Sequence, residues 1–207
     1  MTPAQQAIET VYRGFKAPTP PVIEGCPCCL DTRGVDVLLT TPLRQLSGQA
    51  LGRYVSGAFL TVGSERDFKY LLPRILEIAV SAPGEATNPE IILGKLALAN
   101  WRSWPASQRE AVEKLIHIWF EQALAQDLAE ADDGWIGQES ESVLCGAARA
   151  GLPLAPWLAR LGEPDAVPVL AKMKERFPRH LSAFWEDVPA AFGELSQCLA
   201  DGSPERS

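Results

Sequence analysis

The sequence predicts an all-α protein, a compact bundle of stacked antiparallel helices. Apolar residues recur at three- and four-residue spacing along most of the 207-residue chain, and no stretch alternates apolar and polar residues over a strand length. Proline, glycine and capping residues divide the chain into segments of helical length. Because these segments follow no fixed sequence repeat, an irregular stack of helical hairpins is the alternative arrangement.

The first predicted helix begins with Thr2 as its N-cap and Pro3 at its first helical position, and it ends before Pro18. An irregular connection over residues 17–30 follows, and it carries three cysteines. A short helix is expected over residues 35–39.

Ser47 opens the next predicted helix, which is expected to end at Gly63. Ser64 and Asp67 then have the spacing of a capping box at the start of a strongly apolar helix. Pro73 lies within that helix and is expected to kink it or restart it.

Two further helices are predicted to begin at Asn88-Pro89 and after Pro105. Ser107 and Glu110 form a capping box in the second of these helices. Its core-facing stripe has near-ideal helical spacing and consists of Val112, Leu115, Ile116, Trp119, Phe120 and Leu124.

Shorter helices are expected over residues 139–150, 154–161 and 164–176. Ser182 is predicted to cap a last helix, which Pro189 should bend. Residues 1–200 are expected to form a single helical domain and residues 201–207 a flexible tail.

Composition and charge restrict the function. Nineteen basic and 26 acidic residues give a net charge of −7, which argues against a nucleic-acid partner. No apolar run approaches the ~20 residues of a membrane helix, so no membrane partner is expected. The polar amino-terminal residues do not resemble a signal peptide, and a cytoplasmic location with reduced cysteines is therefore expected.

The acidic residues are concentrated between residues 121 and 142, a window without lysine or arginine. This acidic stretch is expected to be a docking surface for a basic partner, with the neighbouring Trp135 as an anchor. The alternative is a solvated helix end and loop, with Trp135 packed against the fold. The acidic residues are Glu121, Asp127, Glu130, Asp132, Asp133, Glu139 and Glu141.

Cys26 and Cys29 form a Cys-x-x-Cys pair, and Cys28 lies between them. This spacing is used for half of a zinc site and for redox dithiols. Neither chemistry is complete in the sequence, since a structural zinc needs four ligands and no predicted strand precedes Cys26. The remaining alternative is that these thiols pack as small hydrophobic side chains. No cofactor is expected unless Cys26 and Cys29 hold zinc.

The order of three short motifs resembles an uncharacterised family of small bacterial proteins. The motifs are Cys26-Pro27-Cys28-Cys29, then Thr41-Pro42-Leu43, then Asp67-Phe68 with Leu72-Pro73-Arg74. The resemblance implies a cytoplasmic, mostly helical bacterial protein and supports Cys26 and Cys29 as a pair. It implies no activity and no catalytic residues.

The sequence therefore favours a non-enzymatic protein-binding protein that neutralises a basic partner through its acidic surface. An immunity protein or antitoxin that blocks a toxin is the concrete form of this hypothesis. The alternative is a zinc-binding or thiol-redox protein that uses Cys26 and Cys29.

Overall fold

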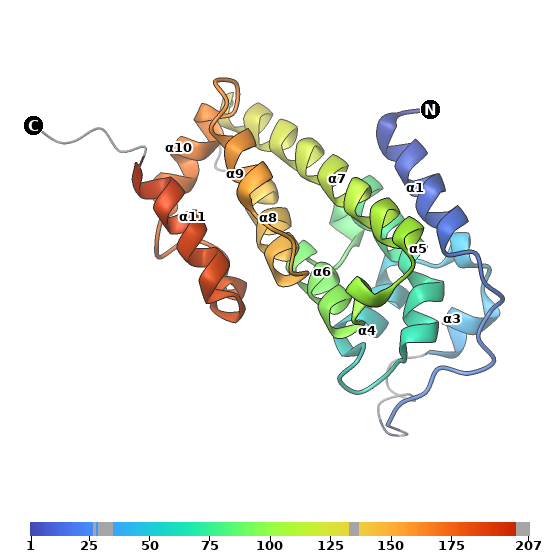
Figure 1. Ribbon diagram of the computed structural model, residues 1–207. Coiled ribbons are helices and arrows are strands. Elements are labelled where there is room, and N and C mark those ends of the chain that lie inside the picture. Colours follow the sequence, from blue (N-terminus) through green and yellow to red (C-terminus); the bar gives the residue numbers. More distant parts are fainter. Residues whose placement is uncertain (27, 29–34, 133–136, 202–207) are drawn as a thin grey trace, which may run out of the picture. The chain divides into compact units, whose positions relative to one another are not determined.

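The structure is a computed structural model that describes residues 1–26, 28, 35–132 and 137–201 (Figure 1). Its regular elements are α-helices and short 3-10 helices, and the described residues contain isolated β-bridges but no named strand. The all-α prediction is confirmed. The chain divides into two compact units, residues 1–118 and 119–207. The expectation of one domain over residues 1–200 stays a prediction.

The first unit is organised around α5. This helix packs against α1 and α4, and α4 also contacts α6. The α-helices are α1 (Pro3–Gly14), α3 (Asp36–Thr40), α4 (Gly48–Gly57), α5 (Glu65–Ser81), α6 (Pro89–Leu98) and the first part of α7 (Ala106–Asp132). The 3-10 helices are η1 (Leu43–Gln45), η2 (Pro83–Glu85) and η3 (Trp101–Ser103).

Capping chemistry sets the start of α1 and α5, as the sequence predicts. The Thr2 hydroxyl accepts a hydrogen bond from the Gln5 amide at 3.2 Å, and the Gln5 side chain accepts one from the Thr2 amide at 2.8 Å. Ser64 and Asp67 form the corresponding box at α5, where Asp67 Oδ1 accepts from the Ser64 amide at 2.8 Å. Each box satisfies amide groups that a helix start leaves without intrahelical partners.

One boundary prediction in this unit is wrong, and of the kink or restart expected at Pro73 the restart is excluded. Helix α4 ends at Gly57, not at Gly63, because a turn with left-handed residues follows it: Phe59 has φ 63° and Gly63 has φ 85°. Helix α5 runs from Glu65 to Ser81 without restarting at Pro73. Pro73 is buried, and the buried stripe continues on both sides of it, from Phe68 to Ile78.

The second unit contains the rest of α7 and a set of shorter helices. Helix α10 packs against α9 and α11, and η4 contacts α8 and α11. The prediction that Pro189 bends one helix is wrong, because Pro189 starts a new helix instead. The elements are α8 (Glu139–Arg149), α9 (Ala155–Leu161), α10 (Val167–Arg176), η4 (Ala183–Asp187) and α11 (Pro189–Asp201).

The core-facing stripe predicted for α7 is confirmed, since all six of its residues are buried. None of the helices in the described part of the chain has both the length and the hydrophobicity of a membrane-spanning segment.

Candidate functional site

Asp127, a member of the acidic stretch, lies in the interior of the second unit with 1% of its surface exposed. Its carboxylate accepts hydrogen bonds from the backbone amides of Glu139 at 3.0 Å and Ser140 at 2.8 Å, and from the Ser140 hydroxyl. These donors lie at the start of α8, so Asp127 caps that helix from a neighbouring one. The expectation that Asp127 faces a partner is wrong.

Glu141 is the second buried carboxylate, also 1% exposed. It accepts a hydrogen bond from Trp185 Nε1 at 2.7 Å, from the Ser182 amide at 3.0 Å and from Arg176 Nη1 at 3.3 Å. These contacts join α8 to α10 and to the start of η4. Because a buried carboxylate needs such partners, Glu141 is a structural ion-pair residue and its assignment to a docking surface is wrong.

Helical spacing in the sequence indicates that both Asp127 and Glu141 are buried. Asp127 lies three residues after Leu124 and so extends the buried stripe of α7. Glu141 lies three and four residues before Leu144 and Cys145, which are fully buried. An acidic residue on a core-facing stripe is better interpreted as a paired interior group than as a surface charge.

Glu121 is exposed, with 52% of its side chain accessible, but it is paired with Arg160 at 3.2 Å. Arg160 also contacts Asp165 at 2.9 Å and Glu163 at 3.2 Å. The hydrogen bond from Arg160 lowers the pKa of Asp165 below its ordinary value. One arginine is therefore shared by three carboxylates, which leaves a local excess of negative charge.

The remaining members of the acidic stretch lie at or near the end of α7 and the start of α8. Glu130 is half-buried and accepts a hydrogen bond from Gln126 at 3.0 Å, and Glu139 is also half-buried. Asp132 is the last residue of α7, and its side chain lies outside the described part of the chain, as do Asp133 and Trp135 altogether. Of the seven acids, Asp127 and Glu141 are thus buried and do not belong to an acidic surface.

The cysteine segment places two thiols together. Cys26 and Cys28 are both exposed, and their Sγ atoms lie 3.0 Å apart. Cys29 lies outside the described residues, so the zinc pair of Cys26 and Cys29 stays a prediction. Within the described ranges, no group of three or more His, Cys, Asp or Glu side chains is placed to hold a metal ion.

The backbone before Cys26 is attached to the turn between α4 and α5. The Cys26 amide donates to the Thr61 carbonyl at 2.9 Å, and the Gly63 amide donates to the Glu24 carbonyl at 2.7 Å. Gly25 and Val62 form an antiparallel bridge between these two hydrogen bonds. Cys26 is therefore held by main-chain contacts, without a preceding strand.

The turn between α4 and α5 contacts buried side chains. Gly63 lies against the Tyr54 hydroxyl, and a Cβ atom added to Gly63 would lie 2.7 Å from that oxygen. Tyr54 in turn donates to Asp67 at 3.3 Å. Burial, and then the charge of Asp67, raise the pKa of Tyr54 well above its ordinary value, which keeps the hydroxyl protonated as a donor. The turn that binds the backbone of Cys26 is thus held in place by buried contacts.

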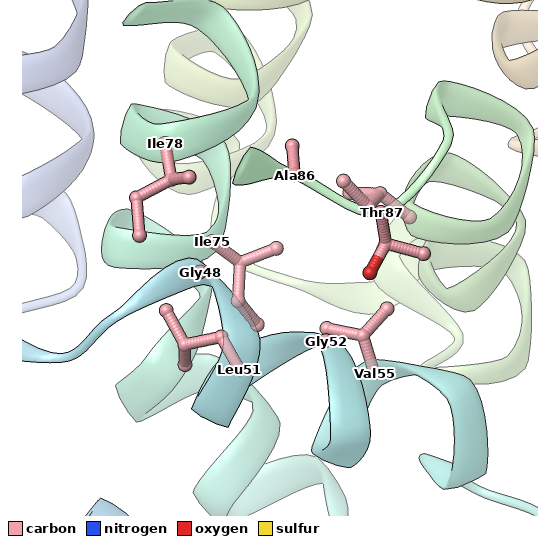
Figure 2. Close-up of a pocket in the computed structure, with 9 residues that line it drawn as sticks. Gly48, Leu51, Gly52, Val55, Ile75, Ile78, Ala86 and Thr87 are labelled. Carbon is pink, nitrogen blue, oxygen red and sulfur yellow. The ribbon is translucent and has the colours of Figure 1, made fainter. Parts of the chain in front are cut away.

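A hollow lies between α4, α5 and the segment that leads into α6 (Figure 2). It is lined by apolar side chains, among them Leu51, Val55 and Ile75, and its volume is about 10 Å³. Close backbone approach keeps it small, because a Cβ atom at Gly48 would overlap the Glu85 carbonyl. A cavity of this size holds at most about one water molecule, so it is not a ligand site.

Comparisons with protein-family models, curated proteins and solved structures found no match to the chain. The resemblance that the three sequence motifs suggest stays a prediction.

Proposed function

We propose that the protein is a non-enzymatic protein-binding protein whose carboxyl-terminal unit, residues 119–207, docks a basic protein. The distribution of charge supports this proposal. Residues 119–207 contain 15 acidic and 7 basic residues, whereas residues 1–118 contain 11 and 12. The net charge of the first unit is +1 and that of the second is −8.

The second unit still has more acidic than basic residues when the buried Asp127 and Glu141 are left out. Glu186 and Glu194 are exposed, and none of the ion pairs among the described residues involves them. Three further carboxylates share Arg160. A surface with such an excess attracts a basic protein over a Debye length of about 8 Å at physiological salt, and it accelerates association more than it strengthens the bound complex.

Proteins that act on nucleic acids carry the complementary charge, because they must contact phosphates. An acidic protein that occupies such a basic surface competes directly with the nucleic acid. We therefore propose an immunity protein or antitoxin that blocks a basic, nuclease-like toxin as the concrete form of the function.

The partner is first sought by native pull-down from the source cell at low salt, with mass spectrometry of the proteins that co-purify. We expect a stoichiometric basic protein that moderate salt releases. If only the bare chain is recovered at low salt, the docking proposal is contradicted.

The surface is then tested with a triple charge reversal in the second unit, Glu130→Lys, Glu186→Lys and Glu194→Lys. We expect the association rate with the recovered partner to fall by about tenfold or more at low salt, and the difference to shrink as salt is added. A matched control reverses three acids of the first unit: Glu85, Glu110 and Glu113. Equal effects of the two triple variants would show that net charge, and not the second unit, governs binding.

A further inference from the structure

The thiol pair in the first unit is chemically independent of the proposed docking surface. Cys26 and Cys28 are exposed while Cys145 is buried, so solvent-borne reagents reach the two neighbouring sulfurs and not the interior one. A disulfide bond is about 2.05 Å long. The two Sγ atoms, 3.0 Å apart, therefore need to approach by about 1 Å to bond.

The support beneath Cys26 favours this reaction. Two main-chain hydrogen bonds and a bridge fix residues 24–26 to the α4–α5 turn, so the position of Cys26 is largely set before reaction. An open hollow of about 520 Å³ lies beside it, lined by residues 24–26 and 59–63, and Leu60 in its lining is 69% exposed. A small molecule reaches this sulfur without opening the fold.

We propose that Cys26 and Cys28 are a redox-active dithiol that exchanges with low-molecular-weight disulfides. This chemistry needs only the two sulfurs that the structure brings together. The pair also differs from the Cys26 and Cys29 spacing that the sequence suggests.

The exchange proceeds in two steps with oxidised glutathione as the oxidant. One cysteine thiolate attacks a glutathione sulfur, which breaks the glutathione disulfide, forms a mixed disulfide and releases one glutathione thiolate. The other cysteine thiolate attacks the protein sulfur of the mixed disulfide and releases the second glutathione. Overall, two cysteine thiols lose two electrons and two protons, and one glutathione disulfide is reduced to two thiols.

The experiment uses the reduced full-length chain, mixed with oxidised glutathione and quenched by alkylation of the remaining thiols. Peptide mapping by mass spectrometry then locates each disulfide and each glutathione adduct. In the wild type and in Cys29→Ser, we expect a disulfide between Cys26 and Cys28, with Cys145 alkylated only after unfolding. A wild-type map that links Cys26 to Cys29 in place of Cys28 would overturn the assignment.

Two controls that keep only one thiol of the pair are made on the Cys29→Ser background, with Cys26→Ser or Cys28→Ser added. Each control has lost the resolving thiol, so the glutathione adduct should accumulate. We expect at least about tenfold less adduct in Cys29→Ser than in either control, because the second thiol is present at a millimolar effective concentration or higher. Equal adduct levels in all three proteins, or no reaction of the wild type, would refute the proposal. Circular dichroism checks that each variant keeps its helical content.

Discussion

Removing the Asp127 carboxylate should destabilise the second unit, because it caps α8 from within the core. Asp127→Ala removes three acceptor contacts: two backbone amides, at 2.8 and 3.0 Å, and the Ser140 hydroxyl. Loss of a helix cap costs about 1 kcal/mol. Hydrogen bonds to a charged group contribute about 1.5–3 kcal/mol, and buried donors left without an acceptor add a penalty. We expect a total loss of about 2–4 kcal/mol in the free energy of unfolding.

The matched control is Glu130→Ala, which removes a carboxylate three residues further along the same helix. Glu130 is half-buried and accepts one hydrogen bond, from Gln126, so its loss should change stability by no more than about 0.5 kcal/mol. Asp127→Asn keeps one acceptor oxygen but not the charge. Its loss in the free energy of unfolding should lie between the losses of the two alanine variants.

The stability change is measured by urea unfolding, followed by circular dichroism. Because a chain with two compact units need not unfold in one step, hydrogen exchange over α8 gives the local readout. We expect faster exchange of the α8 amides in Asp127→Ala than in Glu130→Ala. If the two variants unfold alike and α8 keeps its protection, the capping role of Asp127 is refuted.

Two further predictions concern the same unit. Glu141→Ala should lower stability by about 3–5 kcal/mol, because it leaves the 6%-exposed Arg176 side chain without its buried counter-ion, and it should change the fluorescence of Trp185; a variant as stable as the wild type would contradict the ion-pair role. Arg160→Gln should raise the pKa of Asp165 back toward its ordinary value of 3.8, measured by NMR titration, and an unchanged pKa would contradict the pairing. Since the folded-state pKa of Asp165 is lowered, this contact stabilises the fold above pH 3.8, and its contribution is lost as the pH falls through the folded-state pKa.

Local chemistry made most helix starts predictable from the sequence. The capping residues Thr2 and Ser64 have partners three residues away, so the signal and its cause lie in the same short segment. The end of α4 was not predictable in this way. It stops at Gly57, and the turn that follows pairs with residues 24–26, a partner more than thirty positions away in the sequence. The contacts of this turn with residues 24–26 leave no local pattern in the sequence around Gly57.

The thiol pair shows the same limit. Spacing alone favoured Cys26 and Cys29, because Cys-x-x-Cys is the common unit in metal and redox sites. The structure shows Cys28 beside Cys26, and Cys29 lies outside the described residues, so the pairing of Cys26 with Cys29 stays a prediction. A count of intervening residues does not determine which sulfur atoms lie close together in space.

The acidic stretch shows how to separate structural carboxylates from functional ones. Asp127 and Glu130 have the same chemical group on one helix, yet Asp127 caps α8 while Glu130 lies at the surface boundary. The difference follows from their positions relative to the buried apolar stripe of α7. Acidic residues on such a stripe should therefore be excluded before a cluster of acids is counted as surface charge. When Asp127 and Glu141 are left out of the count, the second unit still has 13 acidic and 7 basic residues. The docking proposal therefore rests on the charge surplus of the whole unit, and charge reversal away from the stripe is the appropriate test.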